Sequence, residues 1–248
     1  MSIDDFWDDI DAENQGTPAL DDLELVENGK EPHIACVLLV DTSGSMTGSP
    51  IAKLNQGLLL FKQAVQNDPV ARRRVDISVV SFADRVNVES EFCGIDAWNP
   101  PTLSAGGTTA MGHAIEQALL LTKERLKTYL RNGTDAYVPW VFLITDGQAT
   151  DMKIGDLRWN RVRQQLVDGE ARSLISFFAV AVEPEAVEPL RALSPNRAPL
   201  VLNKDRWDEM FMWISSSFSG ISRSRPGDAI PLADPTTANG GGWGSVRV

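Results

Sequence analysis

Short apolar runs alternate with amphipathic stretches along residues 33–222, and this alternation limits the chain to few folds. Most of the runs are continuously apolar, which is typical of strands that are covered on both faces. Strands that alternate with helices predict an α/β domain built on a mostly parallel sheet. The predicted strands are Ile34–Val40, Val75–Phe82, Val86–Glu89, Trp140–Thr145, Leu174–Val182 and Pro199–Leu202.

The stretches between these strands carry apolar side chains at every third or fourth position, which predicts helices. Pro50 suits the first turn of one helix, and Gly133 suits the position just after another. Further apolar stripes run through Val162–Leu166 and Trp207–Ile221. The segment Arg85–Glu89 alternates apolar and polar residues, which favours an antiparallel edge strand. We therefore expect one central sheet with helices on both faces and one antiparallel edge strand.

Composition divides the chain into an acidic segment 1–32, the α/β domain 33–222, and a segment 223–248 rich in Gly, Pro, Ser and Thr. Residues 1–31 contain eleven acidic side chains and one lysine, so they hold −10 of the net charge of −11. Such a composition favours disorder in the first segment, and the last segment is expected to be a flexible tail. Trp243 is a candidate docking anchor within that tail.

The acidic segment also contains a pattern that disorder does not require. Four apolar residues lie there at helical spacing among the acids, namely Ile3, Phe6, Trp7 and Ile10. The alternative to disorder is therefore a short amphipathic helix that docks on a partner or on the chain's own domain.

Charge and composition exclude several classes of protein. The nearly neutral domain lacks the basic surface that nucleic-acid binding needs. No apolar stretch is long enough to span a membrane, and the N-terminus has no pattern of a secretory signal. The two cysteines, Cys36 and Cys93, do not form a disulfide framework, and Cys36 is expected to be a buried reduced thiol. We expect a cytoplasmic protein.

Oxygen-bearing side chains follow two of the predicted strands. Asp41, Ser43 and Ser45 form a D-x-S-x-S loop after the first strand, and Asp146 follows Trp140–Thr145. Thr108, in a Gly-Gly-Thr-Thr turn before a helix, adds a further hydroxyl. Ligands bind at the carboxyl ends of parallel strands, and an oxygen-only donor set suits Mg²⁺ or Mn²⁺ rather than Zn²⁺ or Cu²⁺. These five residues are the predicted metal ligands.

Each part of this pattern has a simpler structural interpretation. The loop from Asp41 to Ser49 can serve only to cap the following helix, and Thr108 can cap its own helix. The sequence Thr145-Asp146-Gly147 is a good turn by itself. All three features at the ends of the right segments favour the metal site.

Enzyme motifs fit the sequence poorly. Ser43 stands where an aspartyl-phosphate phosphatase has its second carboxylate, and Gly48-Ser49-Pro50 lacks the lysine of a P-loop. No G-x-S-x-G elbow is present around Ser45. The two histidines, His33 and His113, are expected to be structural, so no general base is predicted beside the loop.

The motifs Leu39–Met46, Gly107-Thr108 and Ile144–Gly147 together resemble those of a von Willebrand factor type A (VWA) domain. The resemblance covers about residues 33–222. It implies a three-layer Rossmann-like fold with a metal-ion-dependent adhesion site (MIDAS). It also implies that the predicted ligands Asp41, Ser43, Ser45, Thr108 and Asp146 hold the metal, some of them through water.

The sequence further resembles the small bacterial VWA proteins of tellurite-resistance operons, the TerY type. The segments that carry this likeness are Asp41–Ile51, Leu54–Gly57, Pro101–Gly112, Val141–Gln148 and Trp207–Phe218. It implies work beside a protein kinase and a PP2C-type phosphatase in stress response or phage defence. The acidic N-terminal segment and the Gly-Trp C-terminal segment depart from that pattern.

We therefore expect a non-catalytic binding module in which a partner's Asp or Glu completes the coordination of Mg²⁺. The alternatives are a metal-dependent phosphate-ester hydrolase and an adaptor of an AAA+ ATPase. A further hypothesis concerns regulation: Asp8 or Asp9 of the acidic segment reaches the chain's own metal and blocks the partner.

Overall fold

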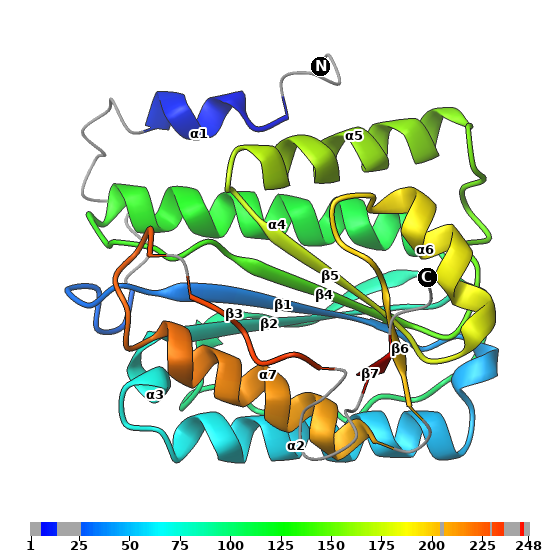
Figure 1. Ribbon diagram of the computed structural model, residues 1–248, viewed down its shortest axis with the longest axis horizontal. Coiled ribbons are helices and arrows are strands. Elements are labelled where there is room, and N and C mark those ends of the chain that lie inside the picture. The colour runs from blue at the N-terminus through cyan, green and yellow to red at the C-terminus, as the bar shows by residue number, and fades with distance from the viewer. Residues whose placement is uncertain (1–5, 14–25, 204–205, 229, 236–243, 246–248) are drawn as a thin grey trace.

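A seven-stranded sheet forms the centre of the protein (Figure 1). The computed structural model describes residues 6–13, 26–203, 206–228, 230–235 and 244–245. The strands lie in the order β3-β2-β1-β4-β5-β6-β7. Their bounds are β1 Ile34–Asp41, β2 Val75–Phe82, β3 Val86–Gly94, β4 Trp140–Thr145, β5 Ser176–Ala181, β6 Leu200–Leu202 and β7 Gly244–Ser245.

Strand β1 lies inside the sheet and pairs in parallel with β2 on one side and β4 on the other. Every residue of β1 is buried. Its alternate side chains enter two separate apolar clusters, with Leu38 on one face of the sheet and Leu39 on the other. This two-sided burial explains why residues 34–40 of the strand are all apolar, because successive side chains point to opposite faces.

Helices cover both faces of the sheet, which gives three layers (Figure 1). Helices α2 and α7 pack on one face, and α4, α5 and α6 cover the other. Helix α1 lies outside α4 and α5. The bounds are α1 Asp8–Glu13, α2 Ser49–Gln66, α3 Ala71–Arg74, α4 Met111–Arg131, α5 Leu157–Ala171, α6 Val187–Leu193 and α7 Trp207–Ile221, with short 3-10 turns η3 Gly44–Met46 and η4 Pro184–Ala186.

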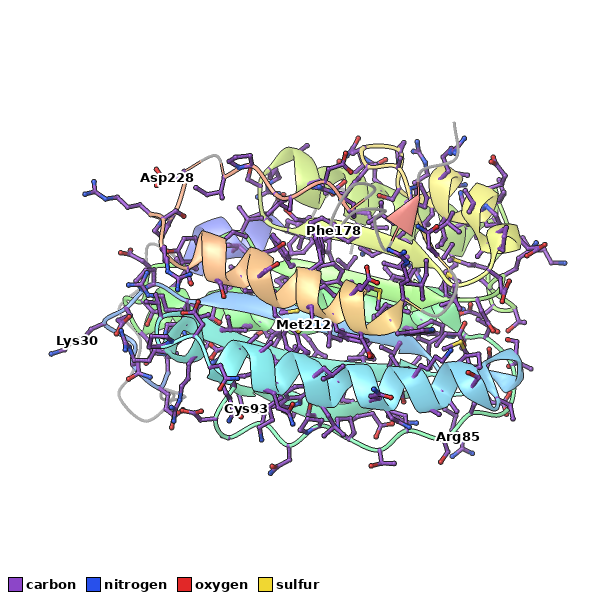
Figure 2. The ribbon with its side chains drawn as sticks, turned by 60° about the horizontal axis from the view of Figure 1, so that its bottom comes forward. Lys30, Arg85, Cys93, Phe178, Met212 and Asp228 are labelled. Carbon is purple, nitrogen blue, oxygen red and sulfur yellow. The ribbon has the colours of Figure 1, made fainter. Side chains whose placement is uncertain are left out.

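Helices α2 and α7 lie side by side over the sheet (Figure 2). Gly57 of α2 faces the ring of Phe211 so closely that an added Cβ would lie 2.0 Å from a ring carbon. Glycine therefore lets the two helices approach. Met212, the next residue of α7, is turned outwards and is 46% exposed.

A buried polar cluster lies near the other end of β1 and β2, away from Asp41. Asp76 accepts hydrogen bonds from Tyr129 at 2.6 Å and from Arg125 at 2.8 Å, and its Oδ2 lies 3.1 Å from His33 Nδ1. Burial raises the pKa of Asp76, but the contacts with His33, Arg125 and Tyr129 outweigh burial and lower it. The structural role predicted for His33 is thus confirmed.

The predicted fold is confirmed, with several differences in detail. Strand β3 runs five residues beyond the predicted Glu89, to Gly94. Three short elements were not predicted, namely α3, α6 and β7, because each has too few residues to show a period. Strand β7 pairs antiparallel with β6, so the sheet has a second antiparallel edge strand.

The two terminal segments also pack on the domain in part. Residues 6–13 dock on the domain as a turn followed by helix α1, so the alternative to disorder describes that piece of the acidic segment. In the C-terminal segment, the indole of Trp213 donates to the carbonyl of Ala233 at 2.7 Å. Trp243 lies outside the described residues, and the domain limits 1–32, 33–222 and 223–248 stay predictions.

Two smaller observations bear on the expected class of protein. Cys36 and Cys93 are both free thiols, and burial raises the pKa of Cys36 well above its ordinary value. None of the helices in the described part of the chain has the length and apolarity to cross a bilayer.

Candidate metal centre

The carboxyl ends of β1 and β4 bring the two predicted aspartates to one place. The strands are neighbours, with Val40 paired to Ile144, so the next residues Asp41 and Thr145 lie side by side. From β1 the chain continues to β2 on one side of the sheet and later to β4 on the other. Such a switch point is where open α/β sheets bind ligands.

Asp41 is fully buried, and both of its carboxylate oxygens accept hydrogen bonds. Oδ1 accepts from the backbone N–H of Ser43 at 2.8 Å, and Oδ2 accepts from the hydroxyl of Thr145 at 2.5 Å. The first bond turns the chain sharply after the strand, and the second ties the loop to β4. Asp41 therefore fixes the shape of the loop that carries the two serines.

The serine hydroxyls connect this loop to the second aspartate. Ser43 Oγ lies 3.0 Å from Ser45 Oγ, and Ser45 donates to Asp146 Oδ1 at 2.8 Å. Four of the five predicted ligands are thus brought together, namely Asp41, Ser43, Ser45 and Asp146. The cluster reaches the surface because Ser45 is exposed, whereas Asp146 is only 9% exposed.

The donor set fits Mg²⁺ or Mn²⁺. Adjacent ligands of an octahedral Mg²⁺ lie about 2.9 Å apart when each Mg–O distance is about 2.0–2.1 Å. The two oxygen–oxygen distances around Ser45 are 3.0 and 2.8 Å. The spacing of these two hydrogen bonds is therefore compatible with the edge of a coordination octahedron.

The charge of the cluster also favours a cation. Burial raises the pKa of Asp41, and the negative charge of Asp146 raises it further, against hydrogen bonds from Ser43 and Thr145 that lower it. Within the described part of the chain, neither aspartate takes part in an ion pair. Two close carboxylates without a basic partner favour binding of a positive ion.

The fifth predicted ligand, Thr108, makes a different contact. Its hydroxyl and its backbone N–H both donate to Oδ1 of Asp84, at 2.8 and 2.7 Å. Backbone hydrogen bonds hold the turn of Thr108 against the serine loop, from Gly44 N–H to Gly107 O at 3.0 Å and from Gly106 N–H to Thr42 O at 2.8 Å. Thr108 therefore lies next to the cluster, with its hydroxyl proton directed to Asp84.

Asp84 was missed by the sequence analysis. It stands two residues after β2, which is parallel to β1 and therefore ends at the same edge of the sheet. The rule that identified Asp41 and Asp146 applies to it equally. Gly107 has a φ of +84°, and a Cβ at this position would lie 2.5 Å from an oxygen of Asp84. The positive φ and this close approach both require glycine.

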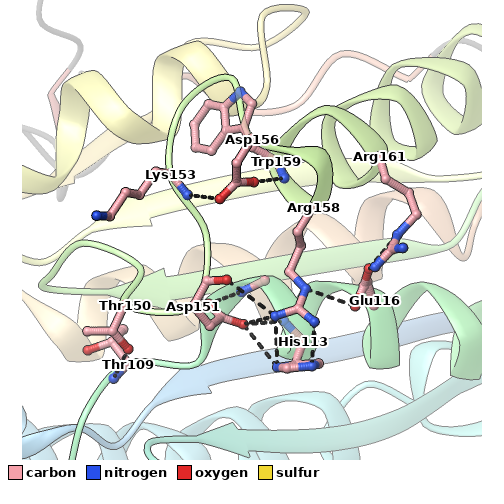
Figure 3. Close-up of polar contacts among 11 residues, drawn as sticks. Thr109, His113, Glu116, Thr150, Asp151, Lys153, Asp156, Arg158, Trp159 and Arg161 are labelled. Atoms are coloured by element: carbon pink, nitrogen blue, oxygen red, sulfur yellow. Dashed lines mark hydrogen bonds and ion pairs between the residues drawn. The ribbon is translucent and has the colours of Figure 1, made fainter.

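The loop after β4 is fixed to the start of α4 (Figure 3). Asp151 accepts the backbone N–H groups of Gly112 and His113, each at 2.9 Å, and Thr150 Oγ1 accepts that of Thr109 at 3.2 Å. Arg158 contacts Asp151 and the ring of His113. The segments that carry Thr108 and Asp146 are thus joined by side chains that were not predicted to act here.

These contacts decide against capping as the role of the predicted ligands. Asp151 caps α4, so the alternative that Thr108 caps this helix is wrong. Ser43 precedes η3 and Gly48 precedes α2, and neither position has a side-chain cap.

The hypothesis that the acidic segment blocks the metal is wrong in this structure. Asp9 is paired with Lys123 and Lys127 of α4, and Asp8 with Arg172. Lys123 lies twelve residues beyond Met111, about 18 Å along the helix from its metal-site end. The acidic residues are held along α4 and α5 rather than at the sheet's edge.

Comparisons with known proteins support the fold. Residues 36–148 match the family model of the von Willebrand factor type A domain. Among solved structures, a von Willebrand factor type A protein from Catenulispora acidiphila has a TM-score of 0.56 and 16% identity, over 76% of this chain and 43% of that one. No curated protein matched the sequence.

Two proteins of pili have the same fold at similar identity. The pilus adhesin SpaC from Lactobacillus rhamnosus GG, in its open conformation, has a TM-score of 0.60 and 12% identity, over 77% of this chain and 30% of SpaC. The PilB minor pilin from Streptococcus sanguinis has a TM-score of 0.53 and 13% identity, over 76% of this chain and 62% of PilB. This chain therefore covers less than two thirds of each of these proteins. The match over residues 36–148 and the shared architecture together show that the domain has the von Willebrand factor type A fold.

Proposed function

We propose that the protein is a metal-dependent binding module whose metal captures an acidic side chain of a partner protein. Asp41, Ser43, Ser45 and Asp146 would hold Mg²⁺ or Mn²⁺ at the carboxyl edge of the sheet, with Thr108 beside them. The observation that carries this proposal is the hydrogen-bonded cluster of two carboxylates and two hydroxyls. Its spacing is compatible with octahedral coordination, and the described residues offer it no basic partner.

The cluster is built to leave part of the cation's surface to an outside ligand. Serine and threonine hydroxyls are neutral, so they neutralise little of the metal's charge. Ser45 and Thr108 are also exposed, which leaves the cation within reach of another molecule. A bound divalent ion supplies a strong attraction for a carboxylate. A partner's Asp or Glu is therefore the ligand that this chemistry favours.

We further propose that the module is not an enzyme. His113, the histidine nearest in sequence to Thr108, lies against Arg158 and Asp151 at the start of α4. Its role there is to hold the loop after β4, as predicted for a structural histidine. A protein that binds through a metal needs no general base beside the serines.

The cellular setting proposed for this module is a bacterial stress-response or phage-defence complex that contains a protein kinase and a PP2C-type phosphatase. The support is the likeness of segments such as Asp41–Ile51 and Pro101–Gly112 to the TerY-type VWA proteins. Kinase and phosphatase genes beside the gene for this protein support that setting, and a neighbouring AAA+ ATPase gene supports the adaptor alternative instead.

The experiment compares capture of a partner by the wild-type protein and by Asp41→Ala, each once with Mg²⁺ well above its Kd and once with EDTA. Asp135→Ala is the matched control, because it removes an exposed acid just before β4, at the opposite edge of the sheet. We expect wild type and the control to retain a partner only with Mg²⁺, and Asp41→Ala to retain none. Partner binding that survives both EDTA and Asp41→Ala would contradict the proposal. Mg²⁺-dependent turnover of phosphate esters that Ser43→Ala abolishes would support the hydrolase alternative.

A further inference from the structure

The N-terminal helix α1 packs against α4 and α5, far from the candidate metal centre (Figure 1). The surface of α4 and α5 that contacts residues 6–13 is called the groove below. Trp7 just before the helix is 1% exposed, and Ile10 is 5% exposed. The indole N–H of Trp7 donates to the main-chain carbonyl of Gln165 in α5 at 3.0 Å. A Cβ added to Gly169 would lie 2.9 Å from the Trp7 ring, so glycine leaves the space that the indole fills.

Basic side chains receive the acids of the same segment. Asp9 accepts a hydrogen bond from Lys127 at 2.7 Å and lies 3.2 Å from the Nζ of Lys123. These two lysines are only 8% and 4% exposed, which is uncommon for lysine. Arg172, just after α5, donates to Asp8 at 2.8 Å. Charge in the groove is therefore complementary to charge in the segment.

An aromatic contact adds to this recognition. The ammonium group of Lys123 lies 4.4 Å from the centre of the Phe6 ring and donates to the Phe6 carbonyl at 3.0 Å. Phe6 packs edge-on against Trp7, with 4.8 Å between the ring centres. The groove thus contacts four consecutive residues, Phe6-Trp7-Asp8-Asp9. It buries the indole of Trp7, places the ammonium group of Lys123 over the Phe6 ring, and forms ion pairs with Asp8 and Asp9.

The helical shape of the segment depends on its contacts with α4 and α5. Helix α1 has six residues, and a helix of this length does not form alone in water. Residues 14–25 separate it from the rest of the chain, so it reaches the groove through a tether of twelve residues. Its contacts are with the outer sides of α4 and α5, whereas the sheet is covered by those helices themselves.

We infer that the groove between α4 and α5 is a peptide-recognition site for an acidic helical segment that begins with Phe-Trp, and that residues 6–13 are its exchangeable occupant. The occupant is the N-terminal segment of this chain, bound here to its own domain, and the same groove takes the segment of a second copy. A segment held in place by a tether competes well against a free one because of its high effective concentration. This site needs no metal and is independent of the function proposed above.

The test uses the full chain with Trp7→Ala and Asp9→Ala, which empties the groove without altering α4 or α5. A fluorescent peptide of residues 1–14 is titrated with this variant and with wild type, and its anisotropy is measured. We expect the peptide to bind the variant at least tenfold more tightly than wild type, whose own segment occupies the groove. A cooperative thermal unfolding transition of the variant shows that its domain is intact.

Two matched changes test whether the groove is the site. A peptide with Trp7→Ala should lose binding at least tenfold, and so should the emptied variant with Lys127→Glu, whose carboxylate would repel Asp9 of the peptide. Raising salt should weaken binding because ion pairs with Lys123 and Lys127 contribute to it. A folded variant that does not bind the peptide overturns the inference.

A second measurement keeps the inference testable if the emptied variant fails to fold. A protease site is placed within residues 14–25 of the otherwise wild-type chain. After folding, the chain is cut there, so that the segment with α1 is no longer covalently attached to the domain. Exchange of the cut segment for labelled peptide, or for the segment of a second cut copy, supports the inference. A cut segment that leaves only when the domain unfolds shows that α1 is a fixed part of the fold, and overturns it.

Discussion

The hydroxyl of Thr108 donates its proton to Oδ1 of Asp84 over 2.8 Å. A hydroxyl that gives its proton to a carboxylate keeps its lone pairs for another partner. Hydrogen bonds of this kind orient metal ligands and make them better donors. Asp84 also accepts the backbone N–H of Thr108, and these bonds lower the pKa of its carboxyl group, which stays ionised. The contact therefore leaves the lone pairs of the Thr108 hydroxyl available to the cation proposed above.

Replacing Asp84 by asparagine is expected to weaken Mg²⁺ binding by about tenfold, since loss of such outer partners costs 10–100-fold in other metal sites. Isothermal titration calorimetry with Mg²⁺ or Mn²⁺ measures the change. Asp135→Asn removes the same charge at the opposite edge of the sheet and should leave the affinity within twofold. Equal affinities for Asp84→Asn and wild type would show that Thr108 needs no orientation by Asp84.

Adding Mg²⁺ is expected to stabilise the protein, because an ion that binds only the folded state raises the free energy of unfolding. The gain is about 2.7 kcal/mol when the ion is present at 100 times its Kd, or roughly 5–10 °C in Tm for a chain of this size. Scanning calorimetry with and without EDTA measures the shift. Asp146→Asn should abolish the shift, because Ser45 then loses its carboxylate acceptor. A full shift in that variant would place the ion elsewhere.

Asp68 makes the stability of the domain depend on acid pH. Its carboxylate accepts the backbone N–H groups of Val70 and Ala71 at 2.9 and 3.1 Å, and Arg223 donates to it at 2.6 Å. Burial raises the pKa of Asp68, but hydrogen bonds from Ser219, Ala71, Val70 and Arg223 outweigh burial and lower it from 3.8 to about 2.

A carboxyl group whose pKa is lowered by folding adds to the free energy of unfolding. This contribution is fully present above the pKa of the unfolded state, 3.8, and is lost as the pH falls towards the folded pKa of about 2. The contribution is about 2 kcal/mol, from about 1.4 kcal/mol per pKa unit. We therefore expect Asp68→Asn to be less stable than wild type at pH 6 by up to about 2 kcal/mol, and the difference to vanish near pH 2. Urea unfolding at both pH values measures it. If the difference in unfolding free energy between Asp68→Asn and wild type is the same at both pH values, the charge of Asp68 does not stabilise the domain.

Two glycines in helices should respond oppositely to alanine. Gly57→Ala places a methyl group 2.0 Å from a ring carbon of Phe211, so α2 and α7 must separate. We expect a loss of about 1–3 kcal/mol in unfolding free energy, as overpacked cores show. Gly220→Ala meets no atom within 4 Å in α7 and should stabilise by up to about 1 kcal/mol, from helix propensity alone. Equal changes in unfolding free energy for the two variants would mean that the ring of Phe211 moves aside without a loss of stability.

Local patterns in the sequence predicted most of the fold. Continuous apolar runs such as Ile34–Val40 predict strands buried on both faces, and the structure has β1 buried throughout. The carboxyl ends of such strands meet at one edge of the sheet, so the loop of Asp41 was expected to lie close to Asp146. The hydrogen bond from Ser45, in that loop, to Asp146 confirms this. Short elements such as α6 and β7 escaped prediction because a few residues show no period.

By itself the sequence determined the class of fold and the residue types at the sheet's edge, since both follow from local periodicity and from the order of strands. The tertiary structure alone decided which side chains meet across the chain. Thr108 contacts Asp84, Asp151 caps a helix that begins forty residues earlier, and Asp8 and Asp9 bind α4 and α5 instead of the metal centre. The physical reason is that hydrogen bonds and ion pairs act over about 3 Å, and distances of that size between remote residues depend on how whole helices and strands pack.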